Sequence, residues 1–281
     1  MLIDRYQAGW ELELAKWHTA LPKDMNLFLL VDGAFVQGLF RQLAGVCKPV
    51  LLFESLPGCA EETRDVSPFL VPFSADERSL ARVLGRCNGQ PMLSAIATTD
   101  NIERLGQQLA AWCIVEVDGQ CFNLRFPDTR WLPAIVDVLT SAQRYAFVGD
   151  ACSWHFIGRD GAWHSLPLQA HVDPSSEVER AVLNEVQFTQ LVVDSESDEM
   201  WSRLQYRGVD WYGLPSHRHQ LLSGSIALAR EHGLDETLTL RWCSQCVSDA
   251  NFNDVQDMHL SFVRWKRDNA EARDEVLPDM G

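Results

Sequence analysis

Short apolar runs alternate with amphipathic stretches along residues 1–170 of the chain. Four apolar runs bounded by turn residues predict buried strands: residues 26–31, 49–53, 68–73 and 92–97. Four stretches with apolar residues at helical spacing predict helices: residues 5–20, 76–87, 99–112 and the segment after Asp128. The polar residues 54–66, which include Pro57 and Gly58, predict a surface loop.

Turn and capping residues divide this region further. Thr99 or Asp100 is expected to cap the helix that ends at Trp112, and Asp128 to cap the following helix. Asp118-Gly119 separates two apolar segments and is the strongest hairpin signal in the chain. A second hairpin is expected over residues 153–165, where two aromatic arms flank a turn.

The pattern changes to helical spacing after Val172. Asp173-Pro174-Ser175-Ser176 predicts a break, and Ser176 with Glu179 predicts a capping box for the next helix. Five helices are expected beyond it: residues 176–191, 196–207, 216–232, 235–248 and 253–268. The predicted fold is therefore an N-terminal α/β lobe with a mixed sheet, residues 1–172, followed by an all-helical lobe, residues 173–281.

Composition narrows the classes of function. The chain has 39 acidic and 24 basic residues, a net charge of −15, which argues against binding nucleic acid or an anionic membrane surface. No apolar run approaches the ~18 residues of a membrane span, and charges interrupt any N-terminal signal sequence. Eight irregularly spaced cysteines are typical of free cytosolic thiols. We therefore expect a cytoplasmic protein.

The segment Trp242-Cys243-Ser-Gln-Cys246 is the most suggestive chemical motif. A thioredoxin-like site would need this motif after a strand, whereas here it falls within a helical region. We therefore interpret the two cysteines as helix residues rather than a redox pair. A structural zinc site could add His259, or His217 and His219, but their spacing does not supply two close ligand pairs. No cofactor or metal is expected.

Acidic residues follow several apolar runs. Asp32, Glu54 and Asp128 could gather at strand ends, where acid–base or metal chemistry is often placed in α/β folds. Asp32 and Asp128, together with His155, suggest an alternative function as a small metal-assisted hydrolase. A turn at Asp32 and a helix cap at Asp128 account for both aspartates without catalysis. The sequence contains no phosphate-binding glycine loop, nucleophile elbow or paired-histidine zinc motif, so no reaction is indicated.

Aromatic residues point instead to binding. The chain has ten tryptophans, and Trp201, Tyr206, Trp211 and Tyr212 cluster around two glycines in the helical region. Aromatic side chains are frequent anchors of protein–protein contacts. This cluster is therefore a candidate partner-binding face, and its alternative is packing beneath the helical lobe.

Several segments, in this order, resemble the type VI secretion effector chaperone (adaptor) family. They lie between residues 26 and 165 and are listed here: Leu29-Leu-Val-Asp-Gly-Ala34, Leu52-Phe-Glu-Ser-Leu56, Ser67-Pro-Phe-Leu-Val71, Gly89-Gln-Pro-Met-Leu-Ser94 and Asp118-Gly-Gln-Cys-Phe-Asn-Leu-Arg-Phe-Pro-Asp-Thr-Arg130. At Pro127-Asp128 the sequence departs from the family, which more often has Asp followed by Pro. The helical remainder is matched only by position.

The resemblance implies a bacterial, cytoplasmic, non-catalytic protein that binds a toxic effector, usually through the effector's N-terminal region, and helps to load it onto the VgrG spike. The helical lobe and its junction with the α/β lobe are the expected effector-holding surface. The motif residues Asp32, Gly33, Arg125, Asp128 and Arg130 are expected to have structural roles, as ion pairs and caps.

Overall fold

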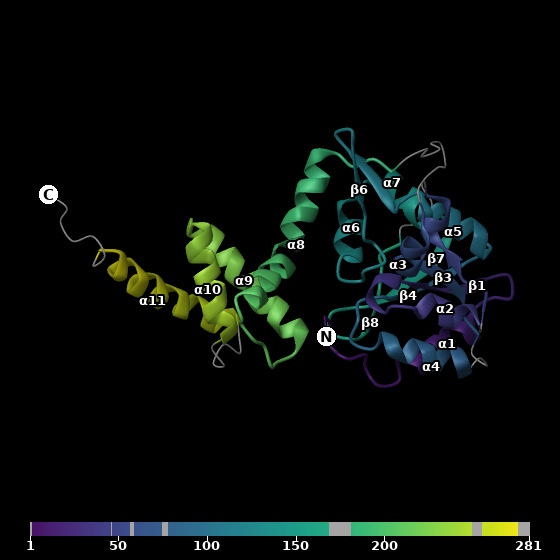
Figure 1. Cartoon of the computed structure of the whole chain (residues 1–281), viewed down its shortest axis with the longest axis horizontal. Helices are drawn as coiled ribbons and strands as arrows, with labels where there is room; N and C mark the ends of the chain where they lie inside the picture. The colour runs from purple at the N-terminus through teal and green to yellow at the C-terminus, as the bar shows by residue number, and fades with distance from the viewer. Residues whose placement is uncertain are drawn as a thin grey trace. The chain divides into compact units, whose positions relative to one another are not determined.

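The computed structural model in Figure 1 contains two compact units, Met1–Val192 and Val193–Gly281. It describes the following residues: 2–45, 47–56, 59–74, 78–168, 181–248 and 255–274. The break predicted at residues 173–176 and its capping box lie outside the described residues. Each unit is treated by itself below.

Within the described residues of the first unit, six strands form one sheet in the order β2-β3-β1-β4-β7-β8. The strand bounds are β1 Asn26–Val31, β2 Val50–Leu51, β3 Phe69–Pro72, β4 Leu93–Thr98, β7 Ala151–Ile157 and β8 Trp163–Ser165. The strands, expected to form a mixed sheet, pair antiparallel throughout. In the centre, Leu29 lies opposite Val71 on one side and Ala95 on the other.

The sheet has a separate hydrophobic core on each face, because successive side chains of a strand point to opposite faces. Phe28 and Leu30 of β1 enter one core, while Leu27, Leu29 and Val31 enter the other. Helices cover both faces, so the central strands are apolar on both sides, which explains their continuous hydrophobic runs (Figure 1). The helices of this unit are α1 Trp10–Ala20, α2 Leu39–Ala44, α3 Glu61–Val66, α4 Arg78–Leu84, α5 Ile102–Ala110, α6 Leu132–Val138 and α7 Ser141–Val148.

Several local predictions for this unit were wrong. The expected strand at residues 49–53 shortens to β2, because Leu52–Ser55 turns into a 3-10 helix. The predicted loop at residues 54–66 contains α3. The cap of α5 is Asn101, whose side chain accepts the Arg104 N–H at 2.8 Å, whereas the Asp100 carboxylate pairs with the Arg104 guanidinium at 3.1 Å. Thr99, Asp100 and Asn101 can all cap a helix, and the backbone conformation determines which side chain reaches the free N–H groups of the first turn.

Both predicted hairpins are confirmed. Strand β5, Ile114–Val117, pairs with β6, Gln120–Asn123, and residues Asp118 and Gly119 connect them with φ of 49° and 76°. Positive φ at both central residues is the signature of a type I′ turn, which an Asp-Gly pair favours. The β7–β8 hairpin accounts for the second prediction.

The second unit is helical throughout its described residues. Helix α8, Glu185–Tyr206, begins in the first unit, and α9 Pro215–Glu231, α10 Glu236–Ser248 and α11 Val255–Asp274 follow. The gap predicted between helices at residues 191–196 is absent from the described α8, because its acidic and serine residues continue the helix. The predicted fold class, an α/β unit followed by helices, is confirmed. None of the described helices combines the length and apolarity needed to cross a bilayer.

Candidate functional site

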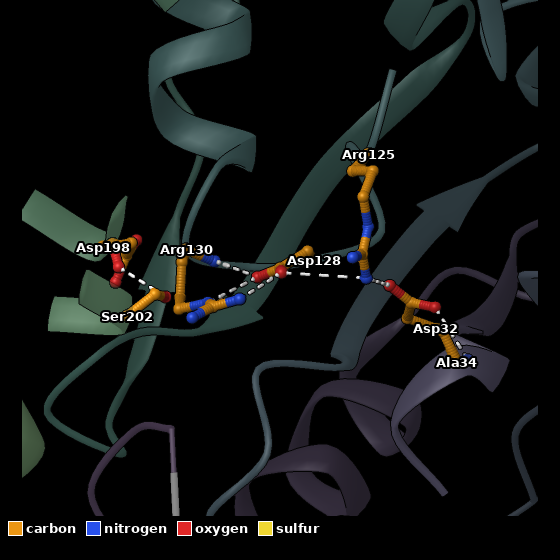
Figure 2. Close-up of polar contacts among 7 residues, drawn as sticks. All are labelled: Asp32, Ala34, Arg125, Asp128, Arg130, Asp198 and Ser202. Carbon is orange, nitrogen blue, oxygen red and sulfur yellow. Dashed lines mark hydrogen bonds and ion pairs between the residues drawn. The ribbon is translucent and has the colours of Figure 1, made fainter. Parts of the chain in front are cut away.

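The motif segments of the sequence meet at one end of the six-stranded sheet. Because neighbouring strands are antiparallel, the residue that follows β1 lies beside those that precede β3 and β4. The Asp32 N–H donates to the Met92 carbonyl at 3.0 Å, and the Thr129 N–H donates to the Pro91 carbonyl at 2.9 Å. Residues far apart in the chain therefore form one cluster, shown in Figure 2.

Asp32 occupies a turn at the exit of β1. One carboxylate oxygen accepts the Ala34 N–H at 3.0 Å and so caps a 3-10 helix, Gly33–Phe35. The other accepts the Arg125 guanidinium at 3.1 Å. The predicted turn at this position is confirmed. Asp32 and Arg125 are 93 residues apart in the sequence, so their contact depends on the tertiary fold.

Asp128 is the most buried member of the cluster, with no exposed side-chain surface. Its Oδ1 accepts both the backbone N–H and the Nε–H of Arg130, and its Oδ2 accepts a guanidinium N–H of Arg130 at 2.7 Å (Figure 2). Arg125 lies 3.9 Å from the same carboxylate and thus stands between the two aspartates. The expected N-cap role of Asp128 was wrong, because α6 begins only at Leu132, with Trp131 in the capping position.

Phe35 is the residue of this cluster that the sequence analysis missed. The guanidinium carbons of Arg125 and Arg130 lie 5.3 and 5.9 Å from the centroid of its ring. This geometry is within the range of cation–π attraction. Its position two residues after Gly33, directly after the first motif segment, was the available signal.

The cluster balances two carboxylates against two guanidinium groups. Burial raises the pKa of Asp32 from its ordinary value; the Ala34 N–H and Arg125 lower it, and the Asp128 charge raises it. The Asp128 oxygens and both Asp32 oxygens already accept hydrogen bonds. A carboxylate held in this way is a poor general base or nucleophile, so the arrangement is suited to fixing the loops together.

Gly33 is required by close approach rather than by a special φ. A Cβ at this position would collide with the backbone carbonyl oxygen of Ser67, two residues before β3. We expect Gly33→Ala to lower the free energy of unfolding by about 1–3 kcal/mol, as overpacking against a backbone atom does. Urea denaturation followed by circular dichroism measures the difference.

The matched control for Gly33→Ala is Gly85→Ala, because a Cβ there meets no atom within 4 Å. It is expected to be neutral or to stabilise by up to about 1 kcal/mol, through the unfolded state. Equal effects of the two substitutions would contradict the packing argument at Gly33.

His155, the third member of the alternative hydrolase cluster, lies elsewhere in the sheet. It is on β7, two strands away from β1, and its ring stacks on Trp17 with centroids 4.0 Å apart. Its Nδ1 is 2.8 Å from the Ser165 hydroxyl. The structure therefore brings Asp32 and Asp128 together, through Arg125, and leaves His155 among the aromatic residues of α1 and β8.

His155 gives the protein an expected dependence on pH. Burial lowers the pKa of His155 below its ordinary 6.5, while the Glu13 charge raises it. Below pH 6.5 the unfolded chain then takes up a proton that the folded chain resists, so stability is lost as the pH falls from 6.5 toward the lowered pKa. Replacing His155 with Asn is expected to flatten this part of the curve, measured as the free energy of unfolding between pH 7 and 5. Parallel curves for the two chains would contradict it.

The thiols of the Trp-Cys-x-x-Cys motif are buried in the second unit. Cys243 and Cys246 have no exposed surface, and burial raises the pKa of Cys243 to about 12. A thiol with this pKa is almost entirely protonated at neutral pH, and only the thiolate is the nucleophile and metal ligand. Among the described residues, no group of three or more His, Cys, Asp or Glu side chains could hold a metal ion.

The four aromatic residues proposed as a partner-binding face divide into two kinds. Trp201 is buried beneath the guanidinium of Arg218, which lies 4.1 Å from its ring centroid, and Trp211 packs against both helical cores. Tyr206 and Tyr212 are 94% and 93% exposed. The two tryptophans therefore pack in the hydrophobic core of the second unit, and the two tyrosines are exposed on its surface, where a partner protein could contact them.

The fold and this cluster define a two-unit protein whose α/β unit carries an ion-paired cluster. In it, Asp32–Arg125 joins two motif loops, and Asp128–Arg130 is a buried pair within one of them. Residues 27–146 match the model of a family described as a domain of unknown function (DUF4123). The match covers less than half of the 281 residues and falls within the first unit, where it includes every motif segment quoted above. No curated protein and no solved structure matches the chain significantly.

Proposed function

We propose that this protein is a type VI secretion effector chaperone, an adaptor that binds a toxic effector in the cytoplasm and helps to load it onto the VgrG spike. The match of residues 27–146 to the DUF4123 family supports this role. The order of the motif segments across the same residues supports it as well. In this proposal the protein is not an enzyme and needs no cofactor.

The observation that carries the proposal is the coincidence of the family match with the ion-paired cluster. Asp32, Arg125, Asp128 and Arg130, which bear the resemblance, all lie inside residues 27–146 and contact one another. These residues form hydrogen bonds with one another. This is expected of residues that hold loops in place rather than of a catalytic centre. The hydrolase alternative would need His155 beside the aspartates, and no geometric observation favours it.

We place the effector contact on the helical unit, at its exposed tyrosines. Tyr206 ends α8, and Tyr212 and Leu214 precede α9, so three exposed apolar or aromatic side chains lie within nine residues of chain. Tyrosine offers a large contact area and a hydroxyl for hydrogen bonding, which suits a protein-binding surface.

Purification of the tagged full-length chain from its native host, with mass spectrometry of the bound proteins, tests the proposal. A toxin-like protein or a VgrG spike is expected to co-elute near one to one. Truncating the toxin from its N-terminus is then expected to abolish binding. Recovery of the chain alone, from cells that express both proteins, would overturn the proposed function.

A double variant, Tyr206→Ala with Tyr212→Ala, tests the proposed contact surface. It is expected to reduce recovery of the toxin about tenfold or more, as loss of binding anchors does. The matched control is Leu260→Ala, since Leu260 is 73% exposed on the same unit and lies on another helix, α11. Full recovery by the double variant would place the contact elsewhere.

A further inference from the structure

Among the residues that the structure describes, one edge of the β5–β6 hairpin is paired and the other has no backbone partner. In a hairpin closed by a two-residue turn, Val117 and Gln120 exchange hydrogen bonds, and so do Val115 and Phe122. The alternate residues then direct their backbone N–H and C=O groups away from the partner strand. On the β5 side this is observed: Glu116 accepts from the Leu183 N–H and donates to the Ala181 carbonyl, both at 2.9 Å.

The same alternation applies to β6. Cys121 lies opposite Glu116, and Asn123 lies opposite Ile114, so the backbone groups of Cys121 and Asn123 point away from β5. Within the described residues, these groups have no hydrogen-bond partner. Gln120, Cys121 and Asn123 are all exposed. The outer edge of β6 therefore presents two N–H groups and two carbonyl groups at the spacing of a strand ladder.

This edge lacks the devices that normally protect a strand from pairing. Exposed edges are usually shortened, bulged, or marked by Lys or Pro. The edge strands of the large sheet, β2 and β8, have only two and three residues among those described. Strand β6 has four, and its sequence Gln-Cys-Phe-Asn contains neither charge nor proline.

The two faces of the hairpin indicate which side chains a paired strand would carry. On one face Phe122 contacts the ring of Phe188, with centroids 4.7 Å apart, which suits an apolar side chain. The opposite face carries Ile114, Glu116, Cys121 and Asn123, and Asp118 lies in the adjoining turn. Residues 114–123 contain these two acidic groups and no basic one. Basic side chains complement this face.

We propose that the outer edge of β6 is a docking edge for an extended segment of a partner protein, in which apolar and basic residues alternate. The segment adds a strand to the hairpin by hydrogen bonds to Cys121 and Asn123, its apolar side chains cover Phe122, and its basic side chains face Glu116 and Asp118. A second copy of this chain is a poorer occupant, because each copy carries a net charge of −15.

The test uses the full-length chain and a seven-residue probe peptide of alternating Lys and Val, acetylated and amidated. Binding is measured by fluorescence anisotropy, and hydrogen exchange of the backbone amides by NMR. The peptide is expected to bind and to slow exchange at Cys121 and Asn123. A peptide with Glu in place of Lys, and one with alternate N-methylated amides, are each expected to bind about tenfold more weakly or worse.

Asn123→Pro removes an outward N–H while breaking no bond to β5, and is expected to weaken binding about tenfold or more. Asn123→Thr keeps the N–H and is the matched control, with binding within about twofold. The N-methylated peptide on the wild-type chain gives the same information if the proline variant does not fold.

Three results would each overturn the proposal. The Lys-Val peptide fails to bind, or it binds equally well after N-methylation or to the Asn123→Pro chain. In the third, the amides of β6 are protected by dimerisation in the absence of peptide. The inference stands apart from the proposed function. The Asn123→Pro chain distinguishes the two proposals. If it captures an effector and VgrG, the adaptor role is supported; if it also binds the peptide as well as the wild-type chain does, the docking edge is rejected.

Discussion

Replacing Arg130 with Met is expected to lower the free energy of unfolding by about 3–5 kcal/mol, because the substitution removes the closest counter-charge of a buried carboxylate. Asp128 has no exposed side-chain surface, Arg130 is 13% exposed, and three hydrogen bonds join them. The side-chain bonds are lost in the variant, while the cost of burying Asp128 remains. Chemical denaturation of the wild-type and variant chains measures the difference.

Two controls separate this effect from simple loss of side-chain volume. Arg125→Met removes a guanidinium that is 47% exposed and leaves the buried Asp32 carboxylate without this partner, so it is expected to cost about 1–3 kcal/mol, less than Arg130→Met. The double variant Arg130→Met with Asp128→Asn no longer buries a charge at position 128, so it is expected to be more stable than Arg130→Met alone. If the double variant is the less stable of the two, the buried carboxylate is not the source of the loss.

Replacing Trp242 with Ala is expected to cost about 3–5 kcal/mol in the second unit, since it deletes a fully buried indole and leaves a cavity. The ring of Trp242 contacts Phe262 with centroids 5.0 Å apart and Trp265 at 5.4 Å. These three residues connect α10 to α11. Thermal unfolding followed by near-ultraviolet circular dichroism and amide exchange is expected to show α10 and α11 opening first.

Tyr206→Ala is the matched aromatic control for Trp242→Ala. Its side chain is 94% exposed, so truncation is expected to change stability by no more than about 0.5 kcal/mol. A large loss of stability in Tyr206→Ala, or none in Trp242→Ala, would contradict the assignment of the helical core.

The stability losses expected for Arg130→Met and Trp242→Ala both assign structural roles to the candidate motifs. The Asp32–Arg125 pair joins two loops at one end of the sheet, and the Asp128–Arg130 pair stabilises one of these loops. The cysteines of the Trp-Cys-x-x-Cys motif follow Trp242 in α10 and have no exposed surface. Motifs that suggest catalysis or redox chemistry in a sequence can thus serve packing and electrostatics. In the proposed adaptor, binding would then fall to exposed groups, such as Tyr206, Tyr212 and the edge of β6.

Local pattern predicted much of the fold. The apolar run at Asn26–Val31 became β1, the Asp118-Gly119 pair became a type I′ turn, and helical spacing predicted α9 and α10. Each of these signals depends on residues within a few positions of one another, which act through the same backbone segment. The sequence also predicted that the α/β region precedes the helical region.

Only the tertiary structure decided which distant residues meet. The strand order places Asp32 beside Arg125 and leaves His155 two strands away from β1. The start of α6 at Leu132 leaves Asp128, an expected cap, as the partner of Arg130 in the loop before the helix. It also decides that the outer edge of β6 has no partner among the described residues, while the backbone of Glu116 in β5 is bonded to Ala181 and Leu183. Periodicity reports which face of an element is buried, whereas pairing partners and shared charges depend on how whole elements pack.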